Sequence, residues 1–369
     1  MTLSVSDGAS VTRTVDDEFD LVELPDLASA REEWQELALR SGNVFATWEW
    51  ASTWDAHFRS GRPLALHACR DREGKLVAIL PLYLAARRPV HLLRLLGHGP
   101  ADELGPVCAP GDVPAVAHVL PRLVAERPLG ASAVVLERLS GAGGWRTLLE
   151  APSISQESSP VLHVRGRSWA EFLASCSRNL REQAGRRERK LAREHSLSFR
   201  LTQDPDRLDA DLSTLFALHA LRWREHARAF SGAREAFHRD FARVALARGW
   251  LRLWIAEVDG APAAAWYGFR FAGSDWYYNA GRDPAWDRYS LGFVLLTHTI
   301  RCTFVDGLHS YRFLLGPEEY KSRFADDDPG LDTLVLGHGL SRELVTGGAA
   351  LVRRLRRLGL PRRLIRSLE

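Results

Sequence analysis

The chain has 369 residues, too many for one ordinary hydrophobic core, so we expect two domains. Hydrophobic residues make up 46% and charged residues 26%, which is typical of globular proteins and argues against a disordered or fibrous chain. The formal net charge of +3 gives little support to a nucleic-acid-binding protein, and we expect no DNA partner.

The apolar runs are shorter than the ~20 residues that span a bilayer, so no transmembrane helix is expected. The first twenty residues are polar and acidic and lack the apolar segment of a secretory signal. The cysteines are widely spaced and form no CxxC pair, which favours reduced thiols in a cytoplasmic protein over a zinc site or a disulfide framework. The histidines are scattered as well, so we expect no metal. Only three basic residues are lysines: Lys75, Lys190 and Lys321.

The first half predicts one α/β unit after a loose polar arm at 1–18. Helices are expected over 26–42, with Gly42 as the stop signal, and over 47–58. Strands follow at 64–70, 76–85 and 90–97, then a helix at 113–126 and a strand at 133–139.

The second half repeats this order. A strand at 251–258 enters the turn Asp259-Gly260, a strong hairpin signal. Further strands are expected at 263–271, 275–281 and 310–316, with an apolar helix at 290–307. Two matching antiparallel meanders at a nearly constant offset suggest a duplicated domain, although hairpins also recur by chance.

Helices join and follow the two halves. Ser168 is a plausible N-cap, a long arginine-rich helix follows from Ser177, and two more helices are expected at 206–228 and 233–249. We therefore predict an α/β (α+β) fold of two tandem domains. The expected parts are an arm at 1–18, domains at 19–165 and 166–340, and a basic C-terminal helix at 341–369.

Several common catalytic motifs are absent: GxGxxG, GxxxxGK[ST], HExxH and GxSxG. Hydride transfer, ATP hydrolysis and zinc hydrolysis therefore lose their usual sequence support. Group transfer remains, in a site made of backbone donors and a few side chains.

The loop 281–292 is the first candidate site. A strand ends there, and the apolar helix is expected to begin at Ser290, with Gly292 in its first turn. The free amides and the dipole of a helix start bind phosphate, and Gly292 would let a pyrophosphate approach closely. The alternative is a simple serine N-cap with a glycine needed for packing.

The segment 316–324 is the second candidate. Lys321 could bind a carboxylate or phosphate or stabilise developing negative charge, and Tyr320 beside it could donate a proton. A surface salt bridge between Lys321 and Glu318 is the more common arrangement for an exposed lysine.

Weaker candidates lie on three other segments. Arg178 and Asn179 begin the arginine-rich helix, which could bind a polyanion, but glutamates at 182, 188 and 194 make a solvated helix face at least as plausible. On the strand 275–281, alternation places Asn279 on the same face as Tyr277.

Tyr278 belongs to that strand, and His219, Arg222 and Trp223 share a helix face. Each of these could line a cleft or simply pack. From Leu351 to Glu369 the chain holds seven arginines against one glutamate, so this helix could lie on an anionic membrane. We favour packing of its Leu/Ile stripe on its own domain.

The order of these segments resembles a known family. WEWASTW, SRNLREQAGRRERK, LHALRW, the Asp-Gly hairpin, YYNAGRDPAWDRYSLGF and FLLGPEEYKSRF together are similar to the CelD/BcsL-type acetyltransferases. That family is a cellulose-biosynthesis-associated branch of the GNAT superfamily and is related to the FemABX aminoacyl transferases. The resemblance covers about 20–340 and rests mainly on 170–325.

The resemblance implies tandem GNAT-like domains and an acyl-CoA donor such as acetyl-CoA. The donor's pyrophosphate would meet the amides of Tyr289, Ser290, Leu291 and Gly292. The family's Gly-x-x-x-Tyr-Lys pattern falls on Gly316, Tyr320 and Lys321, and its mid-chain Arg/Asn segment on Arg178 and Asn179. Relatives usually read Asp-Phe-Leu where this chain has Arg312-Phe313-Leu314, so Arg312 replaces a carboxylate.

The implied reaction is direct attack of an acceptor amine on the thioester. We expect Tyr320, Lys321 and Asn279 at the reacting centre, Arg178, Asn179, Trp223 and Tyr278 at the acceptor, and a small molecule, sugar or cell-envelope precursor as acceptor. One alternative is a FemABX-like enzyme that uses aminoacyl-tRNA. Another is a catalytically silent GNAT-fold component of polysaccharide biosynthesis.

Overall fold

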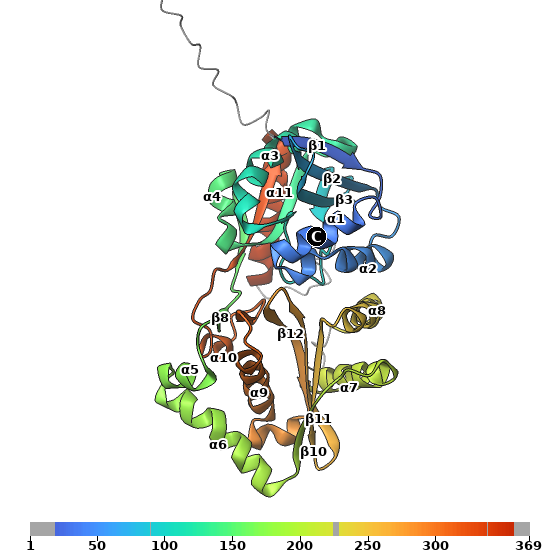
Figure 1. Cartoon of the computed structure of the whole chain (residues 1–369). Helices are drawn as coiled ribbons and strands as arrows, with labels where there is room; N and C mark the ends of the chain where they lie inside the picture. The colour runs from blue at the N-terminus through green and yellow to red at the C-terminus, as the bar shows by residue number, and fades with distance from the viewer. Residues whose placement is uncertain (1–18, 89, 224–228, 338, 358–369) are drawn as a thin grey trace, which may run out of the picture.

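The computed structural model describes residues 19–88, 90–223, 229–337 and 339–357. The predicted arm at 1–18 and the last part of the predicted C-terminal helix lie outside these ranges. Two mixed, mainly antiparallel sheets lie one above the other, each flanked by helices (Figure 1). The predicted α/β (α+β) fold is confirmed.

The first sheet has the order β1-β2-β3-β4-β6-β14-β7, with β5 beside β3. Its neighbours pair antiparallel except β4 and β6, which run parallel. The strands are β1 Phe19–Leu24, β2 Leu64–Asp71, β3 Leu76–Ala86, β4 Leu92–Leu95, β5 Val107–Cys108, β6 Ala133–Ser140, β7 Ser153–Glu157 and β14 Leu331–Gly337.

The second sheet has the order β8-β13-β12-β11-β10-β9. Again one pair is parallel, β12 with β13. The strands are β8 Val161–His163, β9 Leu197–Leu201, β10 Leu251–Val258, β11 Ala261–Phe271, β12 Ser274–Arg282 and β13 Ser310–Arg312.

The two sheets repeat one topology. In each, four consecutive antiparallel strands are followed by a fifth strand parallel to the fourth: β1 to β4 with β6, and β9 to β12 with β13. A helix joins the fourth strand to the fifth, α3 in the first half and α9 in the second. The predicted duplication is therefore present in the strand order.

The halves also exchange strands. β8 follows β7 in the chain but pairs with β13 of the second sheet, and β14 returns to the first sheet between β6 and β7. A division by sheets would assign β8 to the second unit and β14 to the first. The domain boundaries at 166 and 340 stay a prediction.

Most helices begin and end where the sequence predicts. Gly42 ends α1 in the left-handed conformation, and the side chains of Thr47, Ser168 and Ser177 accept backbone N–H bonds at the starts of α2, α5 and α6. The helices are α1 Arg31–Ser41, α2 Trp48–Phe58, α3 Val113–Glu126, α4 Trp145–Leu149, α5 Trp169–Ser175, α6 Arg178–Glu194, α7 Pro205–Trp223, α8 Ala233–Ala247, α9 Leu291–Val305, α10 Glu319–Ser322 and α11 Gly339–Arg357.

An aromatic cluster joins the two halves. Trp50 of α2 is fully buried, and its ring lies 4.9 Å from Phe237 and 4.6 Å from Phe241 of α8, measured between centroids. At the edge of this contact Arg248, just after α8, forms an ion pair of 2.6 Å with the buried Glu49 of α2. One continuous core therefore extends from the first half into the second.

Helices cover both faces of the second sheet (Figure 1). α7 and α8 lie on the face that continues into the shared core, and α5, α6 and α9 lie on the other. A separate core fills this other face, with Trp266, Tyr277 and Leu295 among its members.

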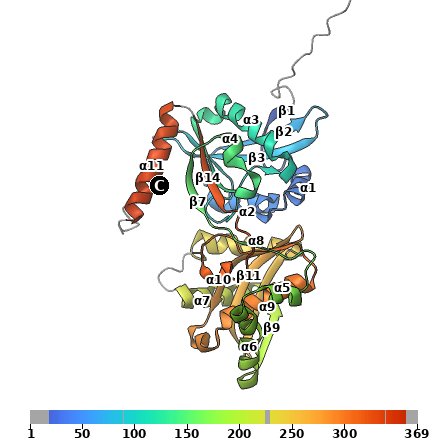
Figure 2. The same cartoon turned by 90° about the vertical axis from the view of Figure 1, so that its left-hand side faces the viewer.

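α11 lies along the outside of the first sheet beside β14 (Figure 2). Its leucines at 340, 344 and 351 are 76%, 56% and 49% exposed. The helix contacts β14, β6 and β7 of the first sheet, while Leu351 is half exposed, and the side chains after Leu351 lie outside the described part of the chain, so packing of the predicted stripe stays a prediction. In the described ranges, none of the helices has an apolar stretch long enough to cross a bilayer. Contact of α11 with anionic membranes stays a prediction that vesicle co-sedimentation can test.

Three histidines make the stability depend on pH. Burial, with a nearby arginine, lowers the pKa of His219 and His298 to about 4 and that of His238 to about 3. The unfolded chain binds these protons near pH 6.5, whereas the folded chain does not, so stability falls as the pH drops below 6.5. We expect a loss of about 1 kcal/mol per histidine between pH 7 and 5.5, measured by urea unfolding.

A matched variant isolates one of these groups. His298 stacks on Phe199 with centroids 3.9 Å apart, and its Nδ1 lies 3.3 Å from Arg301 Nη2, where it accepts a hydrogen bond when neutral. His298→Phe keeps the stacked ring and removes the titration, so its loss of stability over this range should be smaller by about a third. An unchanged pH slope would contradict the assignment.

Candidate functional site

A cavity opens in the second sheet where β13 ends. β13 pairs with β12 only through Ser274–Trp276, whereas β12 continues to Arg282. The cavity beside this free stretch has a volume of about 400 Å³. Its lining combines residues of β11, β12, α7, α9 and α10, among them Trp266, Tyr277, Arg282, Phe293 and Tyr320.

The start of α9 faces this cavity, with Ser290 and Gly292 in its lining. Ser290 adopts the left-handed conformation (φ 55°, ψ 45°) and makes no side-chain cap, so the alternative of a simple serine N-cap is wrong. Its carbonyl accepts from the amides of Phe293 and Val294. The amides of Leu291 and Gly292 therefore lack acceptors within the helix, at the positive end of its dipole. This arrangement suits an anion.

An arginine stands beside these amides. A Cβ built on Gly292 would lie 3.1 Å from Cδ of Arg282, and Arg282 Nε donates to Asp287 at 2.9 Å. Within the described lining Asp287 is the one carboxylate, and this ion pair engages it. Gly292 therefore keeps open the space between the helix start and a fixed cation.

The other two predicted donor residues contribute no side chain to the lining. Leu291 is fully buried in the core, and the Tyr289 hydroxyl donates to Glu194 at 2.6 Å. That bond ties the loop before α9 to the end of α6. The predicted phosphate contacts use the backbone amides of Tyr289 and Leu291, as they do for Ser290 and Gly292, so the position of these two side chains does not decide the prediction.

Tyr320 lines the cavity as expected. Burial raises its pKa well above the ordinary value, and the neighbouring Tyr277 hydroxyl raises it further. Tyr320 therefore stays protonated at neutral pH. It is suited to donate a proton or a hydrogen bond rather than to act as a base.

Lys321 is buried but does not belong to the described cavity lining. Its Nζ donates to Leu315 O at 2.6 Å and forms an ion pair of 2.8 Å with Glu318. The predicted alternative, a salt bridge with Glu318, is thus present, although in a buried setting. The arrangement fixes the loop between β13 and α10, which positions the adjacent Tyr320.

A β-bulge separates Asn279 from Tyr277. Asn279 pairs with Tyr267, and Tyr277 pairs with Gly268, the next residue of β11, so Tyr278 is an extra residue in β12. Directly opposed residues share a face and successive residues of β11 do not. The prediction that Asn279 and Tyr277 share a face is therefore wrong.

The remaining acceptor candidates also lie apart from the cavity lining. Tyr278 is enclosed between the halves, where its hydroxyl donates to Pro100 O at 2.8 Å. Arg178 is 85% exposed and paired with Glu182, and Asn179 accepts from Gln183. Trp223 is 39% exposed. Of the three candidates on α7, which are His219, Arg222 and Trp223, only Arg222 belongs to the described lining of the cavity.

Arg312 also points away from the lining. Its guanidinium lies 4.6 Å from the centre of the Trp276 ring and 3.5 Å from the carboxylate of Glu103 in the first half. Arg312, which stands where relatives have a carboxylate, is thus not a residue of the cavity lining. The replacement is therefore weaker evidence that the protein is catalytically inactive.

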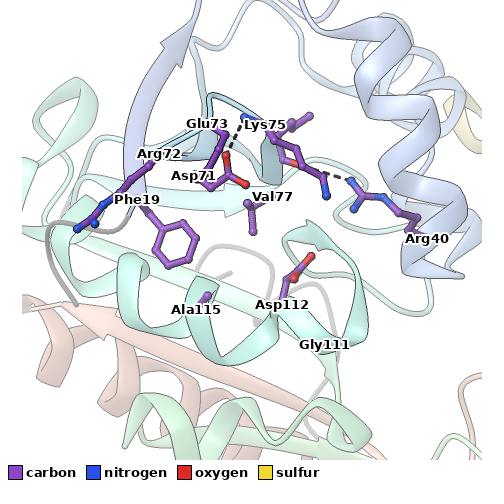
Figure 3. Close-up of a pocket in the computed structure, with 11 residues that line it drawn as sticks. Phe19, Arg40, Asp71, Arg72, Glu73, Lys75, Val77, Gly111, Asp112 and Ala115 are labelled. Carbon is purple, nitrogen blue, oxygen red and sulfur yellow. Dashed lines mark hydrogen bonds between the residues drawn. The ribbon is translucent and has the colours of Figure 1, made fainter.

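The equivalent helix start in the first half differs chemically. α3 begins with Asp112 at its N-cap and Pro114 in its first turn, and a proline has no amide hydrogen. The adjoining cleft, of about 470 Å³, is lined by charges of both signs, including Arg40, Lys75 and Asp71 (Figure 3). The negative charge of Asp112 and the missing amide hydrogen of Pro114 make the start of α3 unsuited to binding phosphate.

Trp266 and Arg282 were given no role in the site from sequence, and Tyr277 was named only as a neighbour of Asn279 on a strand that could line a cleft. Arg282 lies in the candidate loop, which was a usable signal, whereas Trp266 has the sequence pattern of an ordinary core residue. Within the described residues no group of three or more His, Cys, Asp or Glu side chains could hold a metal.

Comparison with known proteins gives a consistent assignment. Residues 178–322 match the model of the acetyltransferase (GNAT) domain family, a segment that holds α6 to α10 and the cavity. The chain thus contains a GNAT-type acetyltransferase domain. The narrower resemblance to CelD/BcsL-type enzymes stays a hypothesis. No curated protein matches the sequence.

Solved structures share the two-unit fold. FemX is 11% identical with a TM-score of 0.59, covering 86% of this chain and 97% of that one. A C-terminal domain (DUF2156) of a putative lysylphosphatidylglycerol synthetase from Agrobacterium fabrum is 14% identical with a TM-score of 0.55, covering 89% and 98%. L-PGS from Bacillus licheniformis is 12% identical with a TM-score of 0.53, covering 85% and 95%. At these identities the likeness concerns the fold.

Proposed function

We propose that this protein is an acyl-CoA-dependent N-acyltransferase whose donor site is the cavity beside α9. The observation that supports this most is the start of α9, where the amides of Leu291 and Gly292 are free of intrahelical bonds next to Arg282. The pyrophosphate of the donor binds there, and its acyl end extends along the free edge of β12. The match to the GNAT domain supports a transferase, and its position at 178–322 supports a site in the second half.

The reaction is direct acyl transfer. The amine nitrogen of the acceptor attacks the thioester carbonyl, the C–S bond breaks, and the proton lost by the nitrogen ends on the CoA sulfur. Tyr320, kept protonated by burial, relays this proton: it gives its own proton to the leaving sulfur and takes the one lost by the nitrogen. Backbone donors on the unpaired edge of β12 stabilise the oxyanion. No covalent enzyme intermediate is needed.

The predicted roles of two residues change in this proposal. Lys321 holds the loop that carries Tyr320, because its ammonium is engaged by Leu315 and Glu318. Asn279 lies on the opposite face from Tyr277 and orients the main chain, since its side chain accepts from the amide of Ala280. Tyr320 is the catalytic residue of the three.

The acceptor is an amine of a small molecule, sugar or cell-envelope precursor. The competing donor is aminoacyl-tRNA, for which the arginine-rich α6 would supply phosphate contacts. Three glutamates interrupt α6, and two of them pair with arginines: Glu182 with Arg178 and Glu188 with Arg301. We therefore favour acyl-CoA as the donor.

A binding and turnover experiment tests the proposal. Acetyl-CoA should bind the purified chain in calorimetry, and a panel of amines should contain one that releases free CoA thiol with acetylation of the amine. Binding of aminoacyl-tRNA without binding of any CoA thioester would overturn the choice of donor. Absence of both would indicate a catalytically silent protein.

A further inference from the structure

Two arginines converge on one ring at the rim of the cavity. The guanidinium carbon of Arg187, on α6, lies 4.8 Å from the centre of the Phe293 ring, and that of Arg323, just after α10, lies 5.6 Å from the same centre. Phe293 directly follows Gly292 and itself lines the cavity. The two cations thus stand beside the helix start that carries the free amides.

Within the part of the chain that the structure describes, this pair has no carboxylate as counter-charge. Within the described residues no carboxylate lies within ion-pair distance of Arg187 or Arg323, although other arginines nearby are paired, such as Arg282 with Asp287. The polar contact of Arg323 is with the neutral amide of Gln183, at 3.1 Å. Burial lowers the pKa of Arg187, and the positive charges of Arg323 and Arg186 lower it further, as expected for neighbouring cations that repel one another.

We propose that Arg187 and Arg323 form a second phosphate site for the donor, and that it binds the 3′-phosphate of CoA. This inference rests on the proposed function. A guanidinium presents a planar fork of N–H donors that matches phosphate oxygens. A dianionic phosphomonoester between the two forks would relieve their repulsion and accept from the guanidinium N–H groups other than Arg323 Nη2, which donates to Gln183.

The position also fits a ligand with phosphates at two points. The amides of Leu291 and Gly292 would bind the pyrophosphate, and Phe293 holds the arginine pair one residue farther along α9. Phe293 also gives an apolar surface against which the nucleotide can lie. The same chemistry suits a phosphodiester of RNA, which the test distinguishes.

Calorimetry with CoA and dephospho-CoA tests the inference, because these ligands differ only in the 3′-phosphate. The native chain should bind CoA 10- to 100-fold more tightly, equivalent to about 1.4–2.7 kcal/mol, because the 3′-phosphate gains charge-assisted hydrogen bonds from the two guanidinium groups. The double variant Arg187→Gln/Arg323→Gln should bind both with the affinity that the native chain has for dephospho-CoA. Arg193→Gln, at an exposed position near the end of α6, is the matched control and should keep the preference.

The outcomes separate the two proposals. If the native chain binds neither ligand, the proposed donor fails. If it binds both equally, or the double variant keeps the preference for CoA, the donor site stands and the arginine site is overturned. Loss of tRNA binding in the double variant, with CoA binding intact, would assign the pair to RNA and also overturn it. Unchanged thermal unfolding of the variants shows that folding is intact.

Discussion

Replacing Gly292 by valine should weaken acetyl-CoA binding at least about 100-fold, equivalent to ~2.7 kcal/mol. A Cβ at this position already lies 3.1 Å from Arg282, so the larger side chain must displace the arginine and fill the space in front of the free amides. Phosphate cannot then approach the helix start. Calorimetry measures the loss, and a thermal melt shows whether the variant is folded.

The matched control is Gly111→Val in the first half, which lies just before the equivalent helix α3 and lines the other cleft. A Cβ there meets nothing within 4 Å, so the side chain should be tolerated. Binding should be unchanged. Loss of binding in this variant, with native affinity in Gly292→Val, would place the donor in the first half.

Replacing Trp50 by alanine should lower the free energy of unfolding by about 3–5 kcal/mol, as for other buried aromatic residues. The ring is fully buried and contacts Phe45 of the first half and Phe237 and Phe241 of the second. Its indole N–H has no hydrogen-bond partner, so the loss comes from packing alone. Chemical unfolding measures it.

Trp223→Ala removes the same side chain from a half-exposed position and should cost less than about 1 kcal/mol. Because Trp50 joins the halves, its loss should also split the unfolding into two transitions, visible in calorimetry. A cost below 1 kcal/mol for Trp50→Ala would mean that the halves do not share this core.

Local signals in the sequence were sufficient for several helix ends, although the helix expected from 26 begins at Arg31 and the strands β1, β7, β8, β9 and β14 were not predicted. Gly42, Thr47, Ser168 and Ser177 act within one turn of the residues they terminate or cap, so these signals can be read from a short stretch of sequence. The duplication was visible because both halves use the same antiparallel meander. These features set the fold and also place the start of α9.

The site was predicted less well, because a register shift and long-range contacts decide it. One bulge at Tyr278 moves Asn279 to the other face of β12, and a simple alternation rule does not include that extra residue. Tyr278 reads as a strand residue in sequence, but Pro100, far away in the chain, accepts its hydroxyl. Lys321 gave no sign that its partner would be a backbone carbonyl.

The exchange of strands was also invisible in the sequence. β14 has no periodicity that distinguishes a strand of the second sheet from one of the first, and only its pairing with β6 and β7 assigns it. Similarly, Arg187 of α6 and Arg323 after α10 lie beside the same ring, that of Phe293, although more than a hundred residues separate them in the sequence.

Hydrogen–deuterium exchange of the native chain, with and without CoA, tests most directly where the diphosphate binds. The account predicts slower exchange in peptides spanning 289–297 when CoA is present, and unchanged exchange in peptides spanning 110–118 at the start of α3. Protection confined to 110–118, or exchange at 289–297 that CoA leaves unaltered under saturating conditions, would contradict it.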